Sequence, residues 1–142
     1  MGRKGDGKRR RPPKSSKATF DTDEPPDYDD STPKFCLHHL QSGFQVSDLL
    51  DKDQQSDFAL ALEKRRSLTW HQLMTAPRLG LGYELMPARE IIPPIPPFFE
   101  DAGRFHVFRY CGKLPMAGVR VNDVFHIVWI EAKFGDLYDH GS

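Results

Sequence analysis

Aliphatic residues are scarce in the first 34 positions of this 142-residue chain, and cysteine is scarce throughout it. The two cysteines, Cys36 and Cys111, form neither a metal-binding spacing nor a disulfide framework, which favours a reducing compartment. The chain has no apolar run near its start, so we expect neither a signal peptide nor a membrane span. The sequence therefore predicts a cytoplasmic protein that stays out of membranes.

Net charge is also lacking, because 20 Lys and Arg residues balance 20 Asp and Glu residues. The balance conceals a segregation: residues 1–17 carry eight cations and one acid, and residues 18–34 carry six acids and one cation. With so little apolar surface to bury, residues 1–34 are predicted to form a disordered, basic-then-acidic tail before a single domain over residues 35–142. The KRRR cluster at Lys8–Arg11 either contacts nucleic acid or an acidic partner, or is neutralised by the acidic half of the tail.

The most definite structural signal lies in residues 104–131, which read as three antiparallel strands joined by two hairpins. Asn122-Asp123 separates two runs rich in β-branched and aromatic residues, and both residues tolerate the positive φ of a two-residue type I′ turn. Gly112–Pro115 reads as a four-residue loop, which places Arg109 opposite Gly118. Because side chains alternate across a strand, this register puts Arg109, Arg120 and Trp129 on one face.

Two helices and a proline-rich segment precede the meander. Gln54–Arg66 carries an apolar stripe with cations at its C-terminal end, and a capping box of Thr69 with Gln72 starts a second, short helix. Phe35–Leu40 reads as a short first strand. Ile91–Phe99 is extended and polyproline-like, either a rigid connector or a ligand for a proline-reading domain. The predicted fold class is α+β, with two layers and the helices on one face of an antiparallel sheet that ends in a three-strand meander.

This element order, together with the chain size, resembles the RelE/ParE superfamily of bacterial toxins over about Phe35–His140, including its RelE-, YoeB- and HigB-like branches. The resemblance also rests on the placing of Arg109, Arg120, Tyr138 and His140. Members that cleave RNA act on the ribosome, with arginines on sheet strands and Tyr or His residues near the C-terminus. The resemblance implies an mRNA endoribonuclease of a toxin–antitoxin system, in which these four residues are catalytic.

The chemistry of RNA cleavage fits these residue types. Attack by the 2′-hydroxyl of RNA needs a base, an acid for the leaving oxygen, and cations for the pentacoordinate phosphate. A neutral His serves as base, and guanidinium groups bind phosphate oxygens in pairs. Lys113 adds a cation for RNA binding, while Phe125 and Trp129 are candidate platforms for stacked bases. No metal or other cofactor is expected, and the implied partners are mRNA on the ribosome and an antitoxin protein.

The alternative is a non-enzymatic interaction module that binds a protein or nucleic-acid partner, because each candidate also has an ordinary structural role. Arg109 can pair with Glu131 or Glu84. Arg120 can be an exposed strand arginine, and Trp129 is more typical of a core than of a stacking platform. The two candidates near the C-terminus can simply cover the sheet or face solvent. Both interpretations remain open at the level of sequence.

Overall fold

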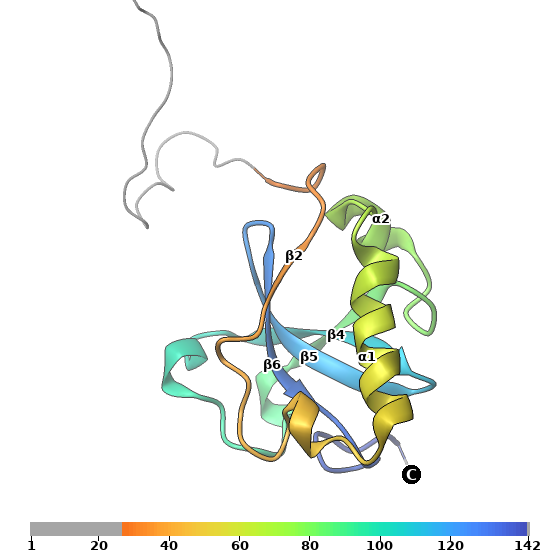
Figure 1. Cartoon of the computed structure of the whole chain (residues 1–142). Coiled ribbons are helices and arrows are strands. Elements are labelled where there is room, and N and C mark those ends of the chain that lie inside the picture. Colours follow the sequence, from red (N-terminus) through yellow and green to blue (C-terminus); the bar gives the residue numbers. More distant parts are fainter. Residues whose placement is uncertain (1–26, 142) are drawn as a thin grey trace, which may run out of the picture.

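The computed structural model describes residues 27–141 of the chain. Within them, two α-helices and five strands alternate with short 3₁₀ turns (Figure 1). In chain order the helices and strands are β2 (Lys34–Cys36), α1 (Lys52–Arg65), α2 (Trp70–Thr75), β3 (Tyr83–Pro87), β4 (Arg104–Cys111), β5 (Leu114–Val121) and β6 (Val124–Ile130).

The five strands form one sheet in the order β2-β6-β5-β4-β3. Strands β3 to β6 are antiparallel neighbours, whereas β2 runs parallel to β6 at one edge. Figure 1 shows α1 and α2 together on one side of the sheet. The predicted α+β class and antiparallel meander are confirmed. The sheet is mixed rather than fully antiparallel, because β2 pairs with a strand that follows it only after the helices and the rest of the meander.

Both helices begin where the sequence provides a cap. The Asp51 carboxylate accepts a hydrogen bond from the backbone N–H of Gln54 at 2.9 Å, which starts α1 two residues earlier than predicted. Thr69 and Gln72 form the predicted capping box at the start of α2. The buried residues of α1 include Phe58 and Ala61, and α1 packs against β4. The caps therefore fix where the helices start, and burial of apolar side chains fixes how they pack.

Only one of the two hairpins has the loop length that the sequence predicted. The two-residue turn at Asn122-Asp123 is confirmed, although φ is positive (59°) at Asn122 and not at Asp123, so the turn is not type I′. The predicted loop Gly112–Pro115 is wrong: Gly112 has a φ of 57°, and the loop is a two-residue turn of Gly112 and Lys113. A bulge in β4 follows, so that Arg109 lies opposite Pro115 rather than Gly118.

The bulge in β4, and not the shorter turn, changes which side chains share a face, because a loop shorter by two residues leaves the alternation of side chains unchanged. Val107 pairs with Ala117, and Arg120 then falls on the opposite side of the sheet from Arg109, where its guanidinium lies over the Trp70 ring of α2. A second bulge, opposite the Ala117–Gly118 bond, keeps Trp129 on the Arg109 side. The expectation that Arg109, Arg120 and Trp129 share a face is therefore wrong for Arg120.

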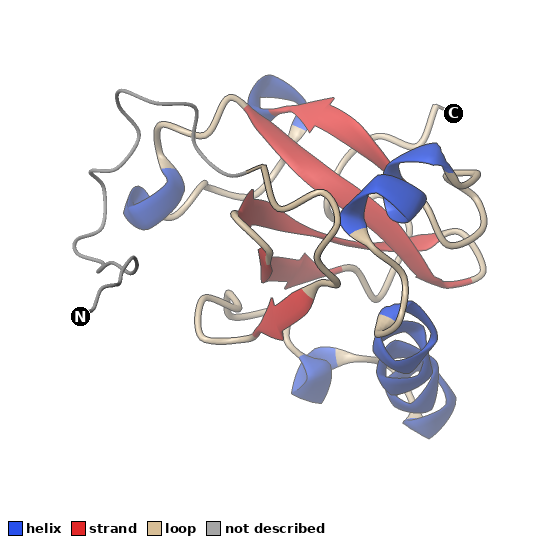
Figure 2. Cartoon of the chain, turned by 90° about the horizontal axis from the view of Figure 1, so that it is seen from above, coloured by secondary structure: helices blue, strands red, loops and turns tan. Residues whose placement is uncertain are grey.

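A hydrophobic core lies on each side of the sheet. The helix-side core contains the buried aromatic residues Trp70, Phe108 and Phe125. The other core contains Phe105 and Trp129, and it is covered by the proline-rich connector and the C-terminal segment rather than by α1 or α2. Figure 2 shows the strands from above, with helices and loops on both sides of them. Its principal buried members are Met86, Ile91, Phe99, Phe105, Val107, Ala117, Val128, Trp129, Leu137 and Tyr138.

The two cores overturn two predicted roles. Phe125 and Trp129 are both 0% exposed, so neither ring can stack on an RNA base, and each is core instead. Ile92 N–H donates to Leu137 O at 2.8 Å, which ties the connector to the C-terminal segment over the sheet. The face that was expected to be open is covered because the C-terminal segment contributes its own apolar side chains to that face.

The N-terminal part of the described chain packs on the helix side. Trp70 N–H donates to Ser31 O and His71 N–H donates to Asp29 O, both at 2.9 Å. Residues 27–34 are therefore part of the folded domain, and the predicted boundary at residue 34 is corrected to include them. Residues 1–26 of the predicted tail, with the cluster at Lys8–Arg11, lie outside the described residues.

Strand β3 was not predicted from the sequence, which indicated only a glycine-bearing loop over residues 78–83.

Candidate functional site

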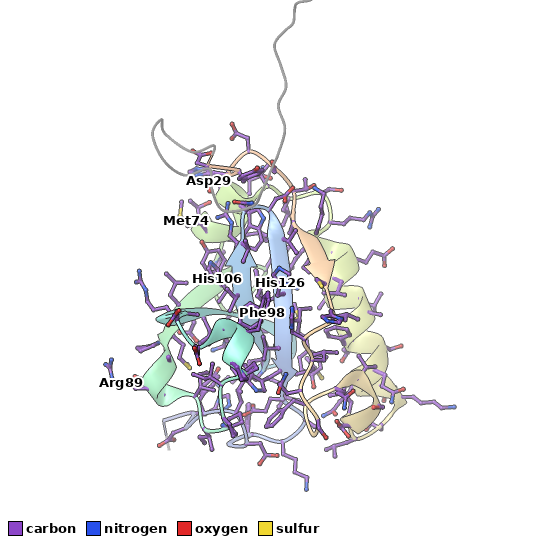
Figure 3. All side chains as sticks on the ribbon, turned by 90° about the vertical axis from the view of Figure 1, so that its left-hand side faces the viewer. Asp29, Met74, Arg89, Phe98, His106 and His126 are labelled. Atoms are coloured by element: carbon purple, nitrogen blue, oxygen red, sulfur yellow. The ribbon has the colours of Figure 1, made fainter. Side chains whose placement is uncertain are left out.

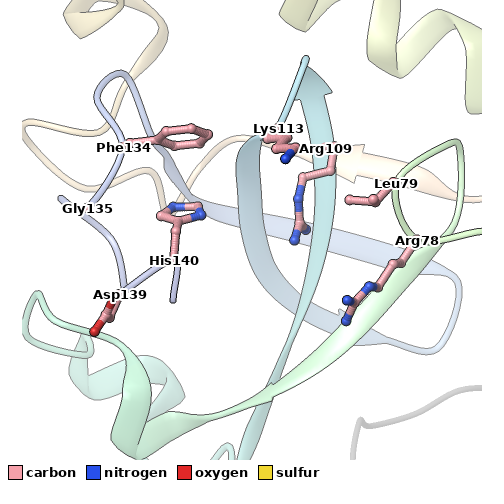
Figure 4. Close-up of a pocket in the computed structure, with 8 residues that line it drawn as sticks. All are labelled: Arg78, Leu79, Arg109, Lys113, Phe134, Gly135, Asp139 and His140. Atoms are coloured by element: carbon pink, nitrogen blue, oxygen red, sulfur yellow. The ribbon is translucent and has the colours of Figure 1, made fainter. Parts of the chain in front are cut away.

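A cleft with a volume of about 510 Å³ lies where the loop before β3, the β4–β5 hairpin and the C-terminal segment meet (Figure 4). Three of its lining side chains are cations, and two others are apolar. Its lining residues are Arg78, Leu79, Arg109, Lys113, Phe134, Gly135, Asp139 and His140. Three of the predicted site residues, Arg109, Lys113 and His140, therefore meet in one place.

Arg109 forms the floor of the cleft and is held by Glu84 of β3. Its Nη2 donates to Glu84 Oε2 at 2.7 Å, while the other oxygen of the same carboxylate accepts from Arg78 Nη1 at 2.9 Å. The pairing of Arg109 with Glu84 is one of the structural alternatives considered from sequence. The Arg109 side chain is 9% exposed, and its Nη1 atom has no hydrogen-bond partner within the described residues. The single negative charge of Glu84 balances one of the two guanidinium charges, so Glu84, Arg78 and Arg109 together retain a net positive charge.

Arg65 of α1 supports this floor from the helix side. Its guanidinium is buried and donates to Leu81 O at 3.0 Å and to the backbone carbonyl of Arg109 at 3.1 Å. Burial lowers the pKa of Arg65 to about 10, so it remains charged at neutral pH. Arg65 thus ties the loop before β3 to β4 and adds a positive charge beneath the cleft.

Lys113 reaches the cleft because of the tight hairpin. Gly112 supplies the positive φ that a two-residue turn needs, and the next residue, Lys113, is exposed at its tip. A four-residue loop would have placed this ammonium group elsewhere. The turn therefore brings a third cation to the side chains of Arg78 and Arg109 (Figure 4).

The C-terminal segment folds around the carboxylate of Glu131, which is fully buried at the end of β6. One carboxylate oxygen accepts from the backbone N–H groups of Gly135, at 3.2 Å, and Leu137, at 2.9 Å. The other lies 2.8 Å from Nε2 of His140. An ionised carboxylate can only accept hydrogen bonds, so we assign the ring proton of His140 to Nε2. Nδ1 then carries no proton and can accept a hydrogen bond or a proton.

Two aromatic rings hold the His140 imidazole in place. The ring centroid of Phe134 lies 4.4 Å from that of His140, and Tyr138 stacks on the same imidazole at 4.3 Å with an interplanar angle of 29°. The His140 side chain is 20% exposed, so it is reachable from the cleft. A buried carboxylate that orients a partly exposed imidazole is a common arrangement in general acid–base catalysis.

Tyr138 lies behind His140 and is not part of the cleft lining. It is 4% exposed, and its hydroxyl has no hydrogen-bond partner among the described residues. Burial raises the pKa of Tyr138 to about 12, against a smaller opposing effect of Arg109, so the phenol is protonated at neutral pH. Its predicted catalytic role is replaced by a packing role, in which it supports the ring of His140.

Arg120 is separated from the cleft by the sheet. Its guanidinium carbon lies 4.4 Å from the centroid of the Trp70 ring, and its Nη2 pairs with Asp29 at 3.1 Å. Its Nε donates to the backbone carbonyl of Asn122 at 2.7 Å. The predicted catalytic role of Arg120 is therefore wrong, because this arginine is occupied in joining the N-terminal segment to the β5–β6 turn and α2.

Sequence reasoning missed several residues of the site: Arg78, Leu79, Glu131, Phe134 and Asp139. Arg78 and Leu79 belong to a glycine-bearing loop whose path depends on contacts with Arg65, far away in the chain. Phe134 precedes and Asp139 follows Gly135 in the chain, and the φ of 97° at Gly135 marks a turn that reverses the C-terminal segment. Together with the aromatic residues of this segment, that glycine was an available signal that the segment folds back rather than frays.

Two kinds of feature are absent from the described residues. Across residues 27–141, the His, Cys, Asp and Glu side chains do not gather in threes or more as a metal ion would require. None of the helices in that part of the chain has the length and apolarity to cross a membrane.

Comparison with models of known protein families, with curated proteins and with solved structures found no match to this chain. The class of protein therefore has to be inferred from the fold and the cleft themselves. The fold is an α+β domain with a mixed five-stranded sheet, and the cleft combines cations with a carboxylate-oriented imidazole.

Proposed function

We propose that this chain is a metal-independent endoribonuclease that cleaves mRNA as the toxin of a bacterial toxin–antitoxin system. The observation that carries the proposal is the Glu131–His140 pair at the edge of a cleft with three cations. Phosphodiester cleavage needs a base and positive charge in one place, and this cleft supplies both. The proposed partners are mRNA on a ribosome and an antitoxin protein.

In the proposed reaction, Nδ1 of His140 takes the proton from a ribose 2′-hydroxyl as the 2′-oxygen attacks the neighbouring phosphorus. The bond between phosphorus and the 5′-oxygen then breaks, and the leaving oxygen takes a proton from the ammonium group of Lys113. The products are a 2′,3′-cyclic phosphate end and a 5′-hydroxyl end. Glu131 does not touch the substrate: it fixes the orientation of the imidazole and stabilises its protonated form.

Arg109 and Arg78 stabilise the phosphate in this scheme. The Nη1 atom of Arg109 is buried and has no partner within the described residues, so Arg109 acts in this scheme through its charge beneath the phosphate. The Arg78 side chain is 61% exposed and can contact a phosphate oxygen directly. Glu84 holds both guanidinium groups in place before substrate arrives. Preorganised cations of this kind favour the pentacoordinate phosphate, whose negative charge exceeds that of the ground state.

Inducible expression of the full chain in a bacterial host tests the proposal. We expect growth arrest together with loss of intact mRNA, and we expect recovery with His140→Ala or Lys113→Ala. Exposed residues outside the cleft provide matched controls: His71→Ala and Arg89→Ala should arrest growth as the parent chain does. A harmless parent chain, or arrest that persists in His140→Ala, would contradict the proposal.

The second candidate function is a non-enzymatic interaction module, and one feature of the surface favours it. Phe98 is 71% exposed and Ile92 is 61% exposed, so the connector presents two large apolar side chains to solvent. Exposed apolar surface of this kind is typical of a site that binds another protein. Phe98 stacks on the ring of His39 on the side of the sheet away from α1, near His126 (Figure 3). A module of this kind would leave growth and mRNA unchanged, and Phe98→Ala rather than His140→Ala would abolish its binding to a partner.

A further inference from the structure

The cleft has apolar walls as well as a charged floor. Phe134 is 55% exposed and Leu79 is 60% exposed, and both line the cleft that contains Arg109 and Lys113. Figure 4 shows Phe134 and Leu79 on opposite sides of Arg109 and Lys113. A site for a bare inorganic anion gains nothing from two exposed apolar side chains, whereas a ligand with a flat apolar part beside its negative charge uses both.

Phe134 is also held in place for such a ligand. The ring of His140 supports it at a centroid distance of 4.4 Å, with the planes inclined by 42°. The Gly135 N–H donates to the buried carboxylate of Glu131, which fixes the backbone beside Phe134. An exposed aromatic ring on a fixed backbone loses little conformational entropy when it contacts a ligand.

We propose that Phe134 is the nucleobase-binding residue of this cleft, a role that rests on the proposed function as a ribonuclease. The ligand class is a nucleotide unit of single-stranded RNA, with its phosphate at Arg109 and Lys113 and its base stacked on Phe134. A base inside a duplex is covered on both faces by its neighbours, so it cannot reach this ring without leaving the stack. Phe134 therefore replaces the buried rings of Phe125 and Trp129 as the base-stacking platform.

The volume of the cleft fits this ligand. Sites for small molecules span roughly 300–1,000 Å³, and this cleft measures about 510 Å³. That space suits one nucleotide and not several. We therefore expect the cleft to hold one nucleotide, with neighbouring nucleotides outside it.

Equilibrium binding of small probes to the full chain separates the base from the phosphate. The probes are ribose 5-phosphate and guanosine monophosphate, which share a sugar and a phosphate and differ in the base. We expect the parent chain to bind guanosine monophosphate about tenfold more tightly, the gain typical of one base–aromatic stack. Phe134→Leu should reduce this ratio to about one without weakening ribose 5-phosphate, and Phe134→Trp should restore it.

Phe98→Leu is the matched control, because it removes another exposed phenyl group outside the cleft, and the ratio should stay near ten. Equal affinities of the parent chain for the two probes, a ratio that survives in Phe134→Leu, or failure to bind either probe would overturn the role of Phe134. Neither probe has a bond that the proposed reaction cleaves. A chain that shows the tenfold ratio but leaves RNA intact would therefore refute the ribonuclease and retain the base-binding site.

Discussion

At the scale of single residues, the site depends on one buried carboxylate. Glu131 is 0% exposed and accepts from two backbone N–H groups and the His140 imidazole. These donors belong to the segment that also buries Leu137 and Tyr138 against the sheet. The same side chain therefore closes the C-terminal segment and orients the proposed base, which links the stability of this segment to the proposed activity.

Glu131→Gln is expected to lower the free energy of unfolding by about 2 kcal/mol, because the amide offers one acceptor oxygen where the carboxylate offers two. Chemical denaturation measures this loss. Glu63→Gln on α1 is the matched control: its side chain is 61% exposed, so its free energy of unfolding should change by less than about 0.5 kcal/mol. Equal stabilities of the Glu131 variant and the parent chain would show that the carboxylate does not hold the segment.

A second prediction concerns pH and His106 on β4. Burial, aided by Arg120 and Arg104, lowers the pKa of His106 to about 4, against 6.5 for an exposed imidazole. The unfolded chain then binds more protons than the folded chain between pH 6.5 and 4, so stability falls as pH drops through that window. After allowance for solvent screening, we expect His106 to account for about 2 kcal/mol of this loss.

Denaturant unfolding at pH 7.0, 5.5 and 4.5 checks this dependence. Burial also lowers the pKa of His39 and His126, so the parent chain is compared with His106→Phe rather than judged alone. The variant should lose about 2 kcal/mol less stability than the parent chain between pH 7.0 and 4.5. Parallel curves for the two proteins would show that His106 titrates normally.

At the scale of elements, the β5–β6 bulge decides which side chains meet. A Cβ atom added to Gly118 would lie 1.8 Å from the backbone oxygen of His126, closer than any real contact. The two strands approach so closely because β6 holds one more residue than β5 between the pairs on either side of the bulge. The bulge moves Trp129 into the core on the cleft side of the sheet.

Gly118→Ala should therefore destabilise the domain by about 3 kcal/mol, because backbone rather than a flexible side chain must move. Thermal and chemical unfolding measure the effect. Gly103→Ala is the control: its added Cβ would meet nothing within 4 Å, so its stability should match the parent chain. A Gly118→Ala variant as stable as the Gly103→Ala variant would contradict the bulge.

Local signals in the sequence predicted the elements whose causes are local. The capping box at Thr69 defines α2, and Asn122-Asp123 defines one hairpin, because the decisive contacts lie within a few residues. The other hairpin was predicted wrongly, since Gly112 permits a turn two residues shorter than the loop that the proline suggested. The bulge in β4 beside this turn reversed which side chains share a face and so separated Arg120 from Arg109, and no local pattern signals this bulge.

The candidate site was predictable only in part for the same reason. Arg109, Lys113 and His140 were identified by residue type and position, and they do meet in the cleft. Glu131 and Phe134 were missed because their roles arise from the fold of the C-terminal segment over a sheet formed earlier in the chain. Long-range contacts of this kind leave no periodicity in the sequence.

At the scale of the whole molecule, the sheet is covered on both sides, and the cleft is at its edge. The helix-side core and the core beneath the C-terminal segment leave no open sheet face among the described residues for RNA. In the proposed function, RNA would instead enter between the loop before β3, the β4–β5 hairpin and the C-terminal segment (Figure 4). Binding through these cations should weaken steeply with salt, as phosphate contacts do.

The most direct test of the account is to map RNA ends after the purified full chain is added to ribosomes translating a defined mRNA. We predict new 5′-hydroxyl ends with the parent chain and none with His140→Ala. Arg120→Lys should still produce them, because Arg120 lies across the sheet from the cleft. An intact mRNA with the parent chain, or cleavage that persists in His140→Ala, would contradict the proposal that this cleft cuts RNA.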